Sequence, residues 1–130
     1  MDLQTAMLCE AATVRDGLLY ILGGGVSTYT VAQYPTPLGV SLAVLIELDY
    51  LDQGEPHGFR ITLLDAEACE LGRAEGEFAT MVELDLNVVA TLPAAIPLAG
   101  MTLPAPGNYE IRLEIDGNTR ARLPLESRAG

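Results

Sequence analysis

The chain has 130 residues, of which 49% are hydrophobic, and its formal net charge at pH 7 is −11. This length suffices for one domain with its own core, and this hydrophobic content is not that of a disordered chain. The negative charge repels phosphate backbones and anionic lipids, which excludes nucleic acid and membrane surfaces as expected partners. We therefore predict one folded, acidic domain over residues 1–130.

The amino-terminal segment, MDLQTAMLCEAATVRDG, has no basic region, and Glu10 interrupts its apolar run. These features are not those of a secretory signal peptide, and no stretch reaches the roughly 20 apolar residues of a membrane helix. We expect a cytoplasmic location. Disulfides are rare in the cytosol, so we expect Cys9 and Cys69 to be thiols that pack as small buried hydrophobic residues.

Three consecutive glycines, residues 23–25, interrupt the segment LLYILGGGVSTYT. A phosphate-binding glycine loop is followed by a helix, whose N-terminal amide groups bind the anion. Strand-forming residues follow these glycines instead, and the chain contains no lysine that could contact a phosphate. We predict that the glycines bend a strand and do not bind a nucleotide.

Alternation of apolar and polar residues dominates the segments 38–50, 57–66 and 108–116, as expected of strands with one buried face. A further strand is predicted after a turn, through Gly72, Ala74, Gly76 and Phe78. The face predicted to be buried consists of Val40, Leu42, Val44, Ile46, Leu48, Tyr50, Phe59, Ile61, Leu63, Tyr109, Ile111, Leu113 and Ile115.

Turn signals such as Asp16-Gly17 and Gly117-Asn118 separate these segments, and helical periodicity is weak throughout. Nothing in the sequence indicates the alternation of strands and helices that a parallel sheet requires. The fold class predicted is all-β, an antiparallel β-sandwich of about eight strands, immunoglobulin-like or related.

The last hairpin can be predicted in register. A loop of three residues, 117–119, aligns the apolar residues of its two strands, whereas a two-residue loop at Gly117-Asn118 places Arg120 opposite Ile115. The predicted pairs are Asp116–Arg120, Ile115–Ala121, Glu114–Arg122, Leu113–Leu123 and Ile111–Leu125.

The acidic turn ELDYLDQGEPH offers the best candidate for a cation site, through Asp49, Asp52, Glu55 and His57. Calcium requires several converging oxygen atoms, but this spacing is not that of a calcium loop. A single histidine with scattered acids also matches no zinc pattern. We expect a solvated turn without a bound metal ion.

Motifs for catalysis are missing from the sequence. Ser27, Ser41 and Ser127 do not lie in a nucleophile elbow, and a triad would have to use His57, which lies in a turn. The chain has no tryptophan, which is the commonest platform for sugars on a sandwich surface. These observations argue against an enzyme or a lectin.

Two segments are more apolar than one small sandwich requires, residues 6–14 and 94–104. A strand that is apolar on both faces has to be covered on both. The cover is either a second subunit, for which a twofold homodimer is the commonest form, or the 92–106 segment folded over its own domain. Pro93 and Pro97 favour an irregular edge strand in this region.

The Leu-Gly-Gly-Gly run that begins at Leu22, Pro106-Gly107-x-Tyr109 and Ile115-Asp116-Gly117 occur in a recognisable order. Over nearly its full length the chain resembles a family of short uncharacterised bacterial proteins, common in actinobacteria, that carry a domain of unknown function. The resemblance implies a cytoplasmic β-sandwich with no catalytic residue to transfer. Pro-Gly-x-Tyr before an alternating strand also resembles immunoglobulin-like sandwiches, which concerns the fold alone.

The function expected from these observations is a non-catalytic binding or assembly module without a cofactor. Its partner is another protein or a second copy of the chain in a homodimer. Two alternatives remain open. One is a small cation-dependent hydrolase at Asp49, Asp52, Glu55 and His57, and the other is a binder of a small apolar ligand between the sheets.

Overall fold

The computed structural model describes residues 1–49, 51–79 and 90–130. The regular secondary structure within these ranges consists of β-strands. Aliphatic and β-branched residues at every second position suit a sheet with one buried face, which explains this outcome. The described ranges contain no helix that could cross a membrane. The predicted all-β fold class is confirmed.

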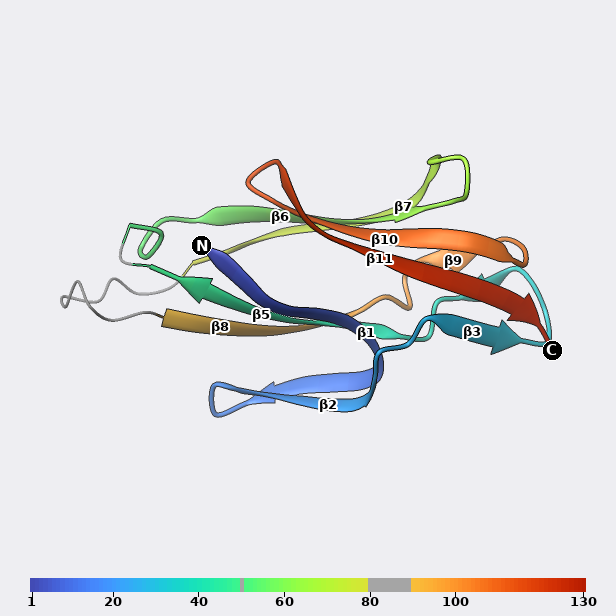
Figure 1. The fold of residues 1–130 in the computed structure, drawn as a ribbon, viewed down its shortest axis with the longest axis horizontal. Helices are drawn as coiled ribbons and strands as arrows, with labels where there is room; N and C mark the ends of the chain where they lie inside the picture. The colour runs from blue at the N-terminus through green and yellow to red at the C-terminus, as the bar shows by residue number, and fades with distance from the viewer. Residues whose placement is uncertain (50, 80–89) are drawn as a thin grey trace.

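Two sheets pack face to face around one core, with the short pair β4 and β9 beside them (Figure 1). In order across sheet A the strands are β2 (Leu18–Gly24), β1 (Asp2–Arg15), β5 (Ser41–Leu48) and β8 (Ala90–Pro97). In order across sheet B they are β3 (Thr28–Val31), β11 (Asn118–Ala129), β10 (Gly107–Ile115), β6 (His57–Leu64) and β7 (Glu70–Phe78). The short pair consists of β4 (Thr36–Pro37) and β9 (Thr102–Leu103).

The described residues form eleven strands rather than about eight, because β3, β4 and β9 are short pieces that the alternation does not reveal. Pairing is antiparallel with one exception: β3 runs parallel to the carboxyl-terminal part of β11. The predicted strand through Gly72 and Phe78 is present as β7. The predicted edge strand is present as β8, which contains Pro93 and Pro97 and, among the strands of the described ranges, pairs only with β5.

The core lies between the sheets and contains the predicted alternating face. Leu42 and Leu48 of sheet A and Ile61, Leu63 and Ile111 of sheet B are completely buried. Burial of each such side chain stabilises the fold by about 1.5–3 kcal/mol, so this alternation accounts for most of the packing energy. Phe59 is half-buried against the core, and Tyr50 lies outside the described residues.

The start of β10 confirms the similarity to immunoglobulin-like strand starts at the level of local geometry. Tyr109 is buried, and its hydroxyl group donates a hydrogen bond of 2.5 Å to the carbonyl oxygen of Ala105, four residues earlier. In such sandwiches a tyrosine bonded back to the preceding backbone fixes the corner where a strand begins. Gly107, at φ +157°, lies within this corner.

The predicted register of the last hairpin is wrong. The turn is Asp116-Gly117, with φ of +52° and +79°, and Ile115 faces Asn118 directly. A tight two-residue turn matches the twist of the strands better than the expected longer loop. A bulge beside Leu113 then restores the match of apolar residues. Beyond this bulge the pairs are Leu113–Ala121, Arg112–Arg122, Ile111–Leu123 and Tyr109–Leu125.

Strand β1 changes its partner halfway along its length. Cys9 lies opposite Ser41 of β5 and also opposite Gly24 of β2, and beyond it β1 pairs with β2 alone. There β1 folds back, so that the β1–β2 hairpin lies below β5 and β8 in the view of Figure 1 and approaches β8. The hairpin closes with a second tight turn, at Asp16-Gly17.

The three glycines lie where the chain leaves this hairpin for sheet B. The amide groups of Gly25 and Val26 both donate to the carbonyl oxygen of Leu8, at 2.9 and 2.8 Å. Gly23 and Gly25 have φ of +62° and +84°, a conformation that side chains with a Cβ atom rarely adopt. The predicted bend is confirmed.

Replacing Gly25 by alanine should lower the free energy of unfolding by about 1 kcal/mol, because alanine is strained at positive φ although no atom blocks its Cβ. Gly100→Ala is the matched control, since its site is equally open and has no positive φ. Urea denaturation measures both. Equal stability of the Gly25→Ala variant and the wild type would contradict the proposed bend.

Candidate functional site

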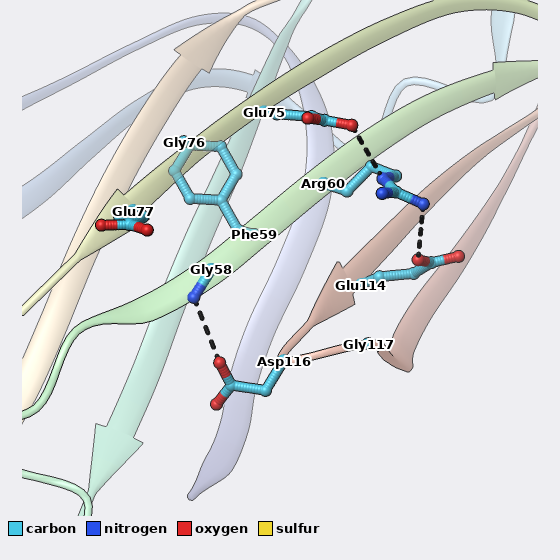
Figure 2. A pocket seen from close by; sticks show the side chains of 9 residues that line it. All are labelled: Gly58, Phe59, Arg60, Glu75, Gly76, Glu77, Glu114, Asp116 and Gly117. Carbon is cyan, nitrogen blue, oxygen red and sulfur yellow. Dashed lines mark hydrogen bonds and ion pairs between the residues drawn. The ribbon is translucent and has the colours of Figure 1, made fainter.

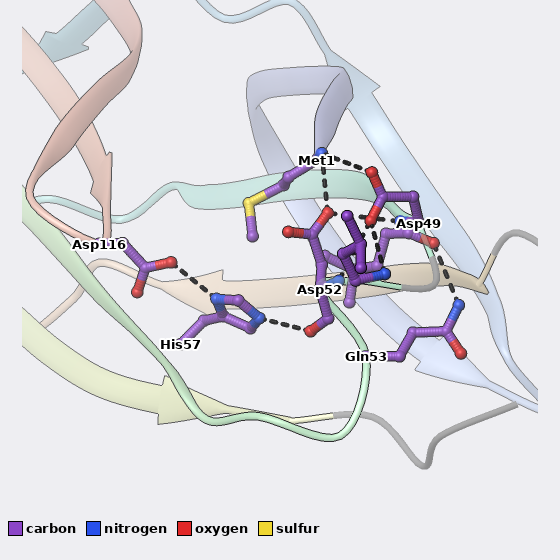
Figure 3. A network of polar contacts seen from close by, with 8 residues as sticks. Met1, Asp49, Asp52, Gln53, His57 and Asp116 are labelled. Carbon is purple, nitrogen blue, oxygen red and sulfur yellow. Dashed lines mark hydrogen bonds and ion pairs between the residues drawn. The ribbon is translucent and has the colours of Figure 1, made fainter.

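Polar side chains gather at one end of the sandwich, where the β5–β6 turn, the β10–β11 turn and the amino terminus meet (Figure 3). Asp52 comes from the β5–β6 turn, His57 from the first position of β6, and Asp116 from the β10–β11 turn. The pairing of Phe59 with Ile115 in the β6–β10 ladder carries Asp116 to the side of His57. We call these three residues the His57 clasp.

His57 is the centre of the clasp, and it is buried. Its Nδ1 atom lies 2.6 Å from Oδ2 of Asp116, and its Nε2 atom lies 2.6 Å from the carbonyl oxygen of Asp52. Both partners are acceptors, so both ring nitrogens must donate, which requires the protonated imidazolium form. The hydrogen bond to the Asp52 backbone, followed by that to Asp116, raises the pKa of His57 above its ordinary value.

Two further contacts fit a cationic His57. Its ring stacks on Phe78 at the end of β7, with ring centres 5.4 Å apart and planes inclined by 28°. An aromatic face attracts a cation by its quadrupole. On the other side, Asp116 also accepts from the amide of Gly58 at 3.1 Å, and its hydrogen bond from His57 is the main cause that lowers its pKa.

The amino-terminal ammonium group of Met1 extends the network. It lies 2.8 Å from Oδ2 of Asp52 and 4.0 Å from Oδ2 of Asp49. The hydrogen bond between them raises the pKa of the ammonium group and lowers that of Asp52. Asp49 also accepts hydrogen bonds from the amides of Leu51 and Asp52, which fixes the turn.

The four residues of the predicted cation site therefore have separate roles. Asp49 and Asp52 face the ammonium group, His57 binds the backbone of Asp52 and the carboxylate of Asp116, and Glu55 is exposed. Within residues 1–49, 51–79 and 90–130, no three acidic, histidine or cysteine side chains are grouped to hold a metal ion. Chemically, the His57 clasp can join two turns through hydrogen bonds from both ring nitrogens of His57.

Sequence reasoning missed Asp116, which it assigned to an ion pair with Arg120. The nearest signal was the alternation of apolar and polar residues on β6 and β10, which marks both as strands but does not decide that they pair. It is the pairing of Phe59 with Ile115 that carries Asp116 toward His57. The distance of 59 residues between the two concealed the contact.

A groove of about 440 Å³ crosses the outer face of sheet B (Figure 2). Arg60 lies at its centre, 3.0 Å from Glu75 and 3.9 Å from Glu114. Gly58 leaves open space beside them, and Asp116 already binds the Gly58 amide. Most of the charges that line this groove are paired within the protein. They give no sign of a ligand.

The opposite side of the molecule carries an apolar surface on the β1–β2 hairpin. Leu18, Tyr20 and Leu22 of β2 project from one face, with exposed fractions of 60, 51 and 70%. We call these three residues the hairpin patch. With Ala11 and Thr13 of β1, Tyr20 and Leu22 line a mainly apolar groove of about 380 Å³. The apolar segment 6–14 singled out from the sequence contributes to this surface.

The two cysteines differ in environment. Cys9 is completely buried, and burial raises the pKa of its thiol, which makes it unreactive as predicted. The expectation is wrong for Cys69, which is exposed. It lies in the β6–β7 turn, where Asp65 accepts hydrogen bonds from the amides of Glu67 and Cys69 and holds the backbone at the surface.

Comparison with known families gives one finding. Residues 4–127, nearly the whole chain, match the model of a family of unknown function, DUF6941. A comparison with curated proteins gave no match. Neither result assigns a ligand, a reaction or a partner, so the surfaces described above carry the functional argument.

The protonated His57 makes stability depend on pH in a definite direction. Because its pKa is raised in the folded state, its contribution is complete below the unfolded value of about 6.5 and is lost as pH rises through the folded value. The wild type should therefore exceed His57→Gln in free energy of unfolding by about 1–3 kcal/mol at pH 5.5, and by less at pH 8.

Urea denaturation at pH 5.5, 6.5, 7.5 and 8 measures this difference. The range ends at pH 8 because the pKa of the Met1 ammonium group, which binds Asp52, is raised above 8.0 and would add its own titration. Arg128→Gln, on the exposed outer face of sheet B, is the control and should show no such trend. A difference between wild type and His57→Gln that is constant with pH would show that His57 is neutral.

Proposed function

The chain belongs to DUF6941, a family of unknown function, and we propose that it is a non-catalytic assembly module that docks a protein on its β1–β2 hairpin. The observation that carries the proposal is the hairpin patch. Monomeric proteins rarely leave several large apolar side chains exposed side by side, and such patches mark interaction surfaces. Here three of them lie on one face of one seven-residue strand.

The position of the patch on an unprotected sheet edge supports the proposal. A free edge invites pairing with another strand, and proteins block it with prolines, charges or short strands. Edge strand β8 contains Pro93 and Pro97, edge strand β7 carries charges such as Arg73 and Glu75, and edge strand β3 has four residues. Edge strand β2 has none of these features, and no other described strand pairs with its outer edge.

The distribution of charge points to the same surface. The outer face of sheet B carries exposed ion pairs, among them Arg60 with Glu75 and Arg128 with Glu126. Strand β2 has no charged residue, in a chain whose net charge is −11. A partner that docks on β2 therefore removes mainly apolar area from water, and Arg15 of β1 is the one charged side chain among the residues that line the groove.

The two alternative functions have less support. A hydrolase at the acidic turn would need an available imidazole nitrogen, but His57 uses both nitrogens within the fold. A ligand between the sheets would need space beside residues such as Leu42 and Ile111, which are completely buried. A bacterial, cytoplasmic protein remains part of the proposal, and the free thiol of exposed Cys69 is consistent with a reducing compartment.

Substitution within the patch tests the proposal. Tagged wild-type chain, cross-linked in a lysate of cells that also express the untagged chain, should retain a bound protein. Leu22→Arg should reduce this capture at least about tenfold, because it places a charge in the apolar contact. Loss of about 1.4 kcal/mol of binding free energy corresponds to a tenfold loss of affinity.

Leu51→Arg is the matched control. Leu51 is the same residue type and 82% exposed, but it lies in the β5–β6 turn and not on the hairpin. Its capture should equal that of the wild type. Equal capture by Leu22→Arg, with an unchanged melting temperature, would refute docking on the hairpin.

A further inference from the structure

The exposed part of β2 has nearly the same pattern in both chain directions. Residues 18–22 are Leu-Leu-Tyr-Ile-Leu, with an aliphatic residue at each equal distance from Tyr20. The regular strand ends at this segment, because Gly23 has φ of +62°. A strand of this kind is complementary to an antiparallel copy of itself, which is the requirement of a twofold interface.

The backbone of β2 is also arranged for such pairing. In an antiparallel ladder, hydrogen-bonded and non-hydrogen-bonded residue pairs alternate. Because the two-residue turn is closed by the pair Arg15–Leu18, the backbone groups of Leu18 and Tyr20 are the ones that point toward β1. The amide and carbonyl groups of Leu19 and Ile21 then point to the outer edge. With Tyr20 on a twofold axis, Leu19 of one copy lies opposite Ile21 of the other, and these outward groups satisfy one another.

We infer that the partner on the hairpin patch is a second copy of this chain, joined β2 to β2 in antiparallel register with Tyr20 on the twofold axis. This inference rests on the proposed function and names its partner. Leu18 of each copy lies beside Leu22 of the other, and the two Tyr20 rings meet on the same face. Cross-strand apolar pairs of this kind stabilise a sheet by roughly 0.2–1 kcal/mol each.

Charge favours a second copy over a different protein. Two molecules that each carry −11 repel one another over most of their surfaces, so a contact between them must be neutral. Strand β2 is neutral over its whole length. A basic partner, which the net charge would attract, would instead gain from exposed acidic side chains such as Glu77 on sheet B, and not from β2.

Sedimentation equilibrium of the full chain tests the association. The average mass should rise from 13.8 kDa toward twice this value with concentration. Tyr20→Lys should remain at 13.8 kDa, because two ammonium groups would meet on the axis. Tyr20→Phe and Leu51→Arg should associate as the wild type does. Undiminished association of Tyr20→Lys would overturn the inference.

Disulfide trapping tests the register and does not depend on a destabilising substitution. In a Cys69→Ser background, Tyr20→Cys should form a covalent dimer under mild oxidation, because its Cβ atoms face each other across the axis. Leu18→Cys alone should not, since its two copies are four residues, or about 13 Å, out of register. A mixture of Leu18→Cys and Leu22→Cys chains should cross-link. Trapping of Leu18→Cys alone, or none for Tyr20→Cys, would overturn the register.

Failure of this inference can be told from failure of the proposed function. A wild-type chain of 13.8 kDa at all concentrations, together with capture of a different protein that Leu22→Arg abolishes, would overturn the second copy and retain docking on the hairpin. A monomer with no capture sensitive to Leu22→Arg would overturn both.

Discussion

The change of partner in β1 is the constraint on which the arrangement of this molecule depends. The carbonyl oxygen of Leu8 accepts hydrogen bonds from the amides of Gly25 and Val26 at the end of the glycine run, while Leu8 itself is paired with β5. One residue later, Cys9 lies opposite both neighbouring strands. Only the amino-terminal half of β1 thus packs on the core, through residues such as Leu3 and Leu8. The other half, with β2, lies below β5 and β8 in the view of Figure 1, and the chain then crosses to sheet B as β3.

Alternation in the sequence was sufficient to predict the sandwich and its core, because the buried face of a strand is a local property of every second residue. The register in which two strands pair depends also on the type of turn and on bulges, and the alternation of residues does not predict either. The last hairpin shows this: apolar residues of β10 and β11 do match, but through a tight turn at Asp116-Gly117 and a bulge beside Leu113. The longer loop expected from side-chain matching alone ignored the bulge.

The His57 clasp shows the corresponding limit for sites. The sequence marked His57 and Asp52 as neighbours in one turn, and they do meet, but through a backbone carbonyl that no side-chain pattern reveals. The carboxylate that completes the clasp is 59 residues away. Since both acceptors favour the charged ring, the clasp is best understood as a buried cation that joins the turns at one end of the sandwich. This role accounts for the chain's single histidine without catalysis.

The His57 clasp and the β1–β2 hairpin differ in how firmly they are joined to the rest of the fold. Tight contacts at the His57 end hold the two sheets together, while the hairpin depends on β1 for all of its ladder hydrogen bonds. A two-stranded hairpin is only marginally stable by itself, and three or more strands with a covered face are needed for independent stability. Pairing at the free edge of β2 would supply the third and fourth strands and would bring Leu18, Tyr20 and Leu22 into contact with the same residues of the other copy. The hairpin is thus the part of the fold with most to gain from a partner, and binding there would stabilise the same bend that Gly25 makes possible.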